Sequence, residues 1–222
     1  MLYRFIAAFI FIALAHSAQA RPWLREKGTT FTAVSVTGTN YLDTTSQTYV
    51  EYGLTSETTL IADIGTSRLY LGAVGGSATF SVRRALSASD AVHKWAYGVG
   101  VGASWTDVAT KPHLRTALSW GKGINMREKT GWVTVEAATI WDIEEAQHVA
   151  KVDATVGLNF TPVTAAMFQF FTAFSDQYSI AKLAPSVIIT PKNAKFSIHI
   201  GTETAIGDFE NSAVKFGLWR KF

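Results

Sequence analysis

Apolar and polar residues alternate along most of the chain, in short segments separated by residues typical of turns. In Trp95–Trp105, for example, every odd position is Trp, Tyr, Val or Ala, and Gly98, Gly100 and Gly102 lie between them. A repeat of two residues is that of a β-strand, whose successive side chains point to opposite faces of the sheet. Because this alternation recurs and helical periodicity hardly occurs, the pattern predicts a transmembrane β-barrel.

The alternating segments predict about twelve strands, with about ten as the alternative if a hairpin is miscounted. An even number of strands would place both chain termini on the periplasmic side of an all-β, antiparallel, up-and-down barrel. The predicted strands are Thr29–Gly38, Gln47–Leu54, Thr58–Gly65, Leu71–Ala85, Lys94–Thr106, His113–Trp120, Thr130–Trp141, His148–Phe160, Ala165–Phe174, Ile180–Ile189, Ala194–Thr204 and Ser212–Phe222.

The connections divide into two sets under this topology. If the N-terminus is periplasmic, the connections on the side opposite the periplasm are all too short to form an ordered lid. They are 41–46, 66–70, 107–112, 142–147, 175–179 and 206–211. The periplasmic connections consist of tight-turn residues, and are 55–57, 87–90, 161–164 and 191–193. Gly121–Lys129 differs from these tight turns, and we expect it to form a longer and more basic periplasmic turn.

Charged side chains recur on one face of the alternating segments. Lys151 and Asp153, for example, alternate with Val152 and Ala154. An Arg or Lys that faces lipid at mid-depth costs roughly 2–4 kcal/mol, so the charged face should line the lumen. The candidate lumen-lining residues are Glu51, Asp63, Arg83, Arg115, Glu136, Lys151, Asp153, Gln169, Lys182, Lys195, His199, Glu203 and Lys215.

These candidates carry both signs of charge, which leaves two interpretations open. The lumen is either a narrow wet channel between acidic and basic walls or a sealed core in which the charges pair. A barrel of about twelve strands is intermediate in width between filled and open barrels. We favour the channel because inward-facing glycines leave space, although close packing of strands also explains such glycines. The inward-facing glycines are Gly98, Gly100, Gly102, Gly157, Gly201 and Gly217.

The first residues of the chain predict a secretory signal peptide. Met1–Ala20 contains a positive charge at Arg4, an apolar run over Phe5–Ala15 and small residues before the expected cleavage site. We therefore expect cleavage after Ala20, export to the bacterial outer membrane and a single barrel domain over residues 21–222.

The last residues resemble a signal for barrel assembly. Val214, Phe216 and Leu218 alternate toward the terminal Phe222, which is the pattern of a strand with one apolar face. A terminal Phe of this kind resembles the sorting signal read by the machinery that folds bacterial outer-membrane barrels, although Arg220 stands where a second apolar residue is usual. The resemblance implies the lipid bilayer and this machinery as partners.

Composition limits the chemistry of the exported chain. Hydrophobic residues make up 48% and charged residues 17%, yet after the signal peptide no apolar run approaches the roughly 18 residues of a membrane helix. Absence of Cys excludes disulfides and thiolate metal sites. The net charge of +3, or +2 without Arg4, is too small to indicate a nucleic-acid partner. The five His lack ligand spacing, so we expect neither a metal nor a cofactor.

One group of residues offers candidate catalytic chemistry. Ser197, His199 and Glu203 lie on one face of a predicted strand. A catalytic serine such as Ser197 would need a base such as His199 within hydrogen-bond distance. Residues two apart on a strand are about 7 Å apart at Cα, however, which is beyond direct hydrogen bonding. The sequence contains neither a Gly-x-Ser-x-Gly nor a His-Glu-x-x-His motif. We therefore expect no enzymatic activity. A lipid-modifying enzyme is kept as the third hypothesis, after the two that follow below.

Tyr49–Leu60 resembles a hairpin of the outer-membrane proteins grouped as the phenol-degradation meta-pathway transporter-like family. In that pattern a Glu-Tyr-Gly-Leu-Thr run, here Glu51–Thr55, ends a strand, a polar pair turns the chain and an alternating strand follows. The resemblance implies a barrel that passes small hydrophobic or aromatic compounds, and it carries over no binding residue. Our first hypothesis is therefore a monomeric channel for small solutes. The second is a sealed structural barrel that supports envelope integrity or binds a periplasmic partner at Gly121–Lys129.

Overall fold

The computed structural model describes residues 23–70, 72, 74–144, 147–176 and 179–222. These residues form twelve strands and no helix long and apolar enough to cross a membrane. The strands are β1 (Thr30–Thr39), β2 (Thr44–Thr55), β3 (Thr58–Arg68), β4 (Val74–Ala85), β5 (His93–Thr106), β6 (Thr110–Met126), β7 (Lys129–Asp142), β8 (His148–Thr161), β9 (Thr164–Phe174), β10 (Ser179–Ile189), β11 (Phe196–Ala205) and β12 (Asp208–Lys221).

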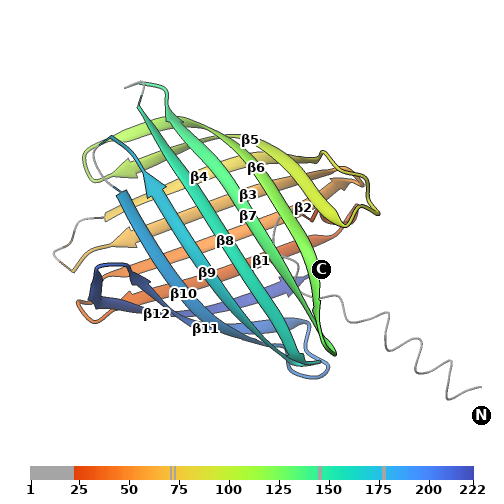
Figure 1. The fold of residues 1–222 in the computed structure, drawn as a ribbon. Coiled ribbons are helices and arrows are strands. Elements are labelled where there is room, and N and C mark those ends of the chain that lie inside the picture. The colour runs from red at the N-terminus through yellow and green to blue at the C-terminus, as the bar shows by residue number, and fades with distance from the viewer. Residues whose placement is uncertain (1–22, 71, 73, 145–146, 177–178) are drawn as a thin grey trace, which may run out of the picture.

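The strands close into a single antiparallel barrel (Figure 1). Each strand pairs with its neighbours in the sequence, and β1 pairs with β12 from Phe31–Lys221 to Thr39–Ala213. Thr30 and Phe222 extend this seam, because each backbone N–H donates to the carbonyl of the other, at 3.2 and 2.9 Å. The predicted all-β, up-and-down barrel of about twelve strands is confirmed.

The two ends of the barrel differ in what they carry. Trp23 and Phe222 are at one end, together with the hairpins β2–β3, β4–β5, β6–β7, β8–β9 and β10–β11, and we call it the terminus end (Figure 1). The remaining connections lie at the opposite end, the loop end. That the terminus end faces the periplasm stays a prediction, and the signal peptide over Met1–Ala20 lies outside the described residues.

The prediction of a long basic turn over Gly121–Lys129 is wrong. β6 continues to Met126 and β7 begins at Lys129, so the turn consists of residues 127 and 128. Pairing of Lys122 with Val133 and of Ile124 with Gly131 shows that both strands extend through this span. The glycines and charged residues of this span interrupt the alternation of apolar and polar residues, so the sequence pattern did not predict a strand there.

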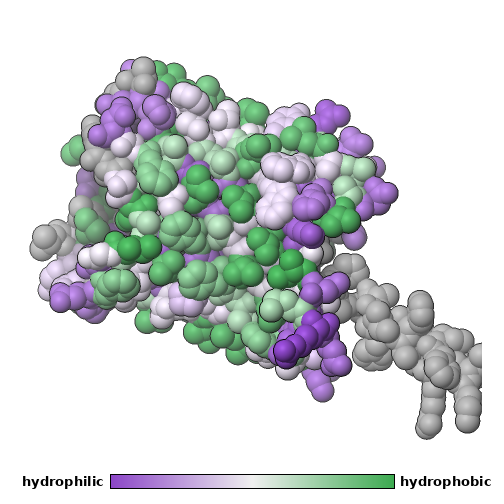
Figure 2. Space-filling view, viewed as in Figure 1, coloured by the Kyte–Doolittle hydropathy of each residue, from purple (hydrophilic) through white to green (hydrophobic). Residues whose placement is uncertain are grey.

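The outer surface of the barrel is apolar. Phe80, Val99 and Val101 are more than half exposed, and Val152 and Val156 are 40% and 42% exposed. Figure 2 shows apolar residues gathered across the middle of the barrel wall, with hydrophilic residues concentrated near the hairpins at its ends. A wall that is apolar outside and polar inside is the arrangement of a barrel surrounded by lipid.

We predict that an arginine on the outer face destabilises the barrel and that one on the inner face does not. Val152 points outward from β8, whereas the adjacent Lys151 points into the lumen. Val152→Arg should make folding into bilayers less favourable by about 2–4 kcal/mol, because the charge would face hydrocarbon. Lys151→Arg is the matched control and should leave it unchanged. Urea titration in lipid vesicles measures both, and equal losses would contradict the assignment of faces.

The predicted assembly signal lies on the outer face of the last strand. Val214, Phe216, Leu218 and Phe222 are all exposed. Phe222 also completes the seam through its backbone bonds to Thr30, so its ring and its backbone have separable roles.

We predict that the ring of Phe222 carries the assembly signal. Phe222→Ala keeps the backbone bonds to Thr30 but removes the ring, whereas deletion of Phe222 removes both. If the ring is read, both changes should reduce heat-modifiable protein in the membrane while the signal peptide is still removed. Normal assembly of Phe222→Ala together with failure of the deletion variant would instead assign the effect to the seam.

Candidate functional site: the barrel lumen

The lumen contains a cavity of about 550 Å³ that is lined by inward-facing side chains of most strands. All but one of the predicted lumen residues line it, namely Glu51, Asp63, Arg83, Arg115, Glu136, Lys151, Asp153, Gln169, Lys182, His199, Glu203 and Lys215. Lys195 is the exception, because it is exposed in the turn before β11. The predicted strand included Ala194 and Lys195, but β11 begins at Phe196, so strand alternation does not orient Lys195.

On β2 to β4, inward-facing side chains become more buried from the loop end to the terminus end. On β2, Gln47 is exposed, Tyr49 is half-buried and Glu51 is 2% exposed. Likewise, Thr59 and Arg83 are almost fully buried where β3 begins and β4 ends. On this side the lumen is therefore wet toward the loop end and closely packed at the terminus end, whereas His113 is a buried inward residue near the loop end of β6.

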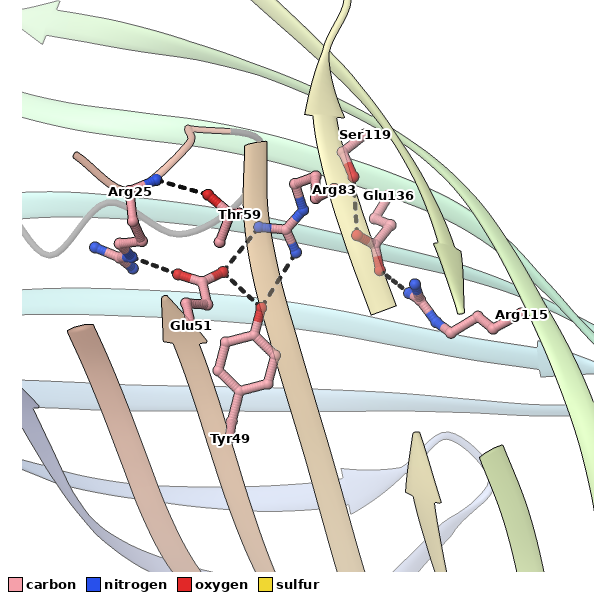
Figure 3. Close-up of polar contacts among 8 residues, drawn as sticks. All are labelled: Arg25, Tyr49, Glu51, Thr59, Arg83, Arg115, Ser119 and Glu136. Carbon is pink, nitrogen blue, oxygen red and sulfur yellow. Dashed lines mark hydrogen bonds and ion pairs between the residues drawn. The ribbon is translucent and has the colours of Figure 1, made fainter. Parts of the chain in front are cut away.

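Glu51 is the centre of a buried ionic cluster at the terminus end (Figure 3). Arg83 Nη1 donates to Glu51 Oε1 at 2.8 Å, and Arg25 Nε donates to Oε2 at 2.5 Å. The Tyr49 hydroxyl donates to Oε1 at 2.6 Å and accepts from Arg83 Nη2 at 3.1 Å. Charge-assisted hydrogen bonds of this kind are the stronger ones. Two guanidinium groups therefore share one carboxylate.

A second cluster joins neighbouring strands on another part of the wall (Figure 3). Arg115 Nη2 on β6 donates to Glu136 Oε1 on β7 at 2.5 Å, and Ser119 Oγ donates to Glu136 Oε2 at 2.8 Å. Glu136 is 5% exposed and Ser119 is 2% exposed. This carboxylate is therefore held by two groups of the wall itself.

Charges nearer the loop end are less constrained. Lys182 Nζ donates to Glu203 Oε1 at 2.8 Å, but both side chains keep contact with solvent. Lys215 lies within electrostatic range of both residues, and Lys151 also faces the cavity. Asp63 accepts one hydrogen bond from Gln47 at 3.0 Å. Solvated charges of both signs can contact a solute that enters the cavity.

Most inward-facing glycines of the lumen do not provide the space that we expected, although a Cβ atom on Gly98 would meet its nearest neighbours only at 3.8 Å. A Cβ atom on Gly157 would lie 2.1 Å from the indole ring of Trp132, so the ring packs flat on this glycine. Gly100 and Gly102 are similarly close to Ser81 and to the backbone of β4. At these positions close packing explains the glycines.

The described residues do not assemble the candidate catalytic group. Ser197 Oγ shares a hydrogen bond with Thr190 Oγ1, and Glu203 is paired with Lys182. The ring of His199 packs on Trp219 with a centroid distance of 5.0 Å. Among the described residues, no group of three or more His, Asp or Glu side chains could hold a metal ion.

Sequence reasoning missed the residues before the first strand. Arg25 lines the cavity, and Trp23 packs against a buried apolar cluster inside the terminus end. The cluster comprises Trp132, Ala165, Met167 and Ile188. Trp23 and Arg25 lie outside any alternating segment, so the pattern that located the other lumen residues had no bearing on them.

Comparisons with known proteins define the class of fold. No protein-family model matches the chain, and no curated protein matches it. Among solved structures, KdgM porin has a TM-score of 0.62 at 4% identity, over 86% of this chain and 99% of that chain. NanC porin has a TM-score of 0.59 at 11% identity, over 85% and 97%.

An outer-membrane channel of Pseudomonas putida F1 has a TM-score of 0.56 at 11% identity, over 93% of this chain and all of that chain. The chain thus has a barrel fold similar to that of porins and outer-membrane channels. At these identities the likeness concerns the fold alone, and it does not bear out the particular family suggested by Tyr49–Leu60.

We predict that loss of the Glu51 charge destabilises the barrel strongly. Glu51→Gln removes the carboxylate that binds Arg83, which is 2% exposed, and breaking a buried ion pair costs about 3–5 kcal/mol. Asp63→Asn is the control, since Asp63 is half-exposed and bonded only to a neutral amide, and should cost about 1 kcal/mol or less. Urea midpoints in vesicles compare the two, and equal midpoints would contradict a buried Glu51 cluster.

Proposed function

We propose that the protein is an outer-membrane channel for small solutes. The observation that carries this proposal is a cavity lined by charges of both signs inside a closed barrel with an apolar outer wall. Solvated charges in such a cavity can replace part of the hydration of a polar solute as it passes. The fold shared with KdgM porin and NanC porin supports the same function.

The proposed setting follows from the two ends of the sequence. A signal peptide over Met1–Ala20 exports the chain, and the assembly machinery reads Phe222 and inserts the barrel into the bilayer. One chain supplies the whole wall of the cavity, so a monomer is sufficient to form the proposed channel. No nucleic acid and no cofactor takes part.

Small aromatic compounds that carry a polar or charged group are the solutes that this lumen suits best. Tyr49 and Phe171 line the same cavity as Lys151 and Lys182, so a ring and a polar substituent both find complementary groups. The resemblance of Tyr49–Leu60 to the phenol-degradation family supports small hydrophobic or aromatic compounds. KdgM porin was solved in complex with disordered oligogalacturonate, which makes this sugar a useful second test solute.

The closely packed terminus end supports one competing function. A barrel sealed by the Glu51 and Glu136 clusters would serve envelope integrity and would pass no solute. The hypothesis of a lipid-modifying enzyme has no such support, because Ser197 and Glu203 bond to other groups and the ring of His199 packs on Trp219.

We predict that the purified barrel conducts ions in planar bilayers and that lumen lysines set its selectivity. Lys151 and Lys215 face the cavity, so Lys151→Gln/Lys215→Gln should shift the reversal potential toward cation selectivity, because positive charge leaves the conduction path. Lys195→Gln is the control, because Lys195 lies outside the cavity. Both variants should keep the urea midpoint of the parent.

A sealed barrel gives the opposite result. There the parent passes no current under any condition, and the double variant unfolds at much lower urea because buried partners are lost. That combination would refute the channel. Recordings with a neutral aromatic, a charged aromatic and oligogalacturonate then identify the solute class from the block of ion current.

A further inference from the structure

Residues Trp23–Gly28, which we call the N-terminal bar, lie inside the terminus end of the barrel. Arg25 N donates to Thr59 Oγ1 at 3.0 Å (Figure 3), and Gly28 N donates to the carbonyl of Gly53 at 2.8 Å. The bar therefore follows the ends of β2 and β3 before the chain enters β1.

Gly53 shows that the bar lies on the lumen side of β2. The inward direction at this position is that of Glu51, two residues earlier. A Cβ atom on Gly53 would lie 2.0 Å from the carbonyl oxygen of Glu26 and 2.8 Å from that of Arg25. The bar backbone thus occupies the space of a side chain at this position, which only glycine leaves free.

The side chains of the bar reach opposite walls of the lumen. Arg25 binds Glu51 on β2, and its guanidinium also lies 4.4 Å from the centre of the Phe31 ring. Trp23 packs against the apolar cluster of β7, β9 and β10, which includes Trp132 and Met167. In the closed strand order, β9 lies across the barrel from β3. The bar therefore spans the terminus end of the lumen.

We infer that the N-terminal bar is the gate of the channel, closing the terminus end when Arg25 is bound to Glu51 and opening it when Arg25 is released. This inference rests on the proposed channel function. The wall allows Arg25 to dissociate from Glu51, because Glu51 keeps Arg83 and Tyr49 as partners when Arg25 leaves. Release therefore does not leave a buried carboxylate unpaired, which is the expensive outcome for a buried ion pair.

A reversible cross-link tests the gate in a single protein. The chain has no cysteine, so Arg25→Cys/Thr59→Cys creates one possible disulfide, between positions that touch in the structure. Reduction gives a bar without its ion pair, and oxidation fixes the bar to the wall. We expect several-fold higher conductance in planar bilayers from the reduced protein than from the oxidised protein, with reversal on each redox cycle.

Two further variants separate the gate from general effects on folding. Trp23→Ala removes the contact with the opposite wall and should raise conductance several-fold without any cysteine. Lys27→Gln changes an exposed side chain of the same bar and should conduct like the parent. Heat modifiability confirms that each variant is a folded barrel.

The outcomes distinguish failure of the gate from failure of the channel. If the membrane-inserted protein does not form the disulfide, the bar is not in the lumen and the inference is wrong. If the parent conducts and the oxidised, reduced and Trp23→Ala proteins conduct equally, the gate is wrong and the channel stands. If the disulfide forms and no protein conducts, including Trp23→Ala, the channel function itself fails and the gate fails with it.

Discussion

The seam between β1 and β12 is the constraint on which the rest of the structure depends. A sheet in hydrocarbon has to satisfy its backbone N–H and C=O groups internally, because lipid offers them no partner. Antiparallel pairing from Phe31–Lys221 to Thr39–Ala213 joins the two ends of the sheet, and Thr30 and Phe222 add the last bonds. Once the sheet is closed, each strand has one face toward the outside and one toward the lumen. Alternation along every strand then separates apolar from polar side chains around the whole barrel.

Closure also determines how the inner charges are stabilised. Toward the terminus end at Glu51, and midway along β7 at Glu136, the carboxylates are nearly fully buried and bound by arginines. Nearer the loop end, Asp63 and Lys151 remain partly solvated and need no such partner. An unpaired charge is expensive in the first environment and tolerable in the second. The sealed barrel and the wet channel thus describe two depths of the same lumen, and the function depends on whether the deep part can open.

Alternation in the sequence was sufficient to predict twelve strands and the faces of most inner residues, because the period of two recurs along the strands. It missed the extension of β6 and β7 over Gly121–Lys129. It could not predict which charges pair, since Arg83 and Glu51 lie on strands that are not adjacent and are 32 residues apart in the chain. It also placed Lys195 in the lumen, because a strand boundary is less sharply encoded than a strand interior. The bar carried no periodicity at all. Its one trace in the sequence is Gly53, an inward glycine within a strand, and such a glycine often marks the close approach of another backbone.

The two buried carboxylates differ in a way that bears on movement within the lumen. Glu136 is bound by Arg115 and Ser119, both of which belong to the wall strand β6. Glu51 is bound by Arg83 and Tyr49 from the wall and by Arg25 from a segment that precedes the barrel. Removing a sole partner from a buried charge is strongly unfavourable, whereas removing one of several leaves the charge compensated. The Glu51 cluster can therefore lose Arg25 while its partners in the wall stay in place, and Arg25 belongs to the segment lying across the lumen.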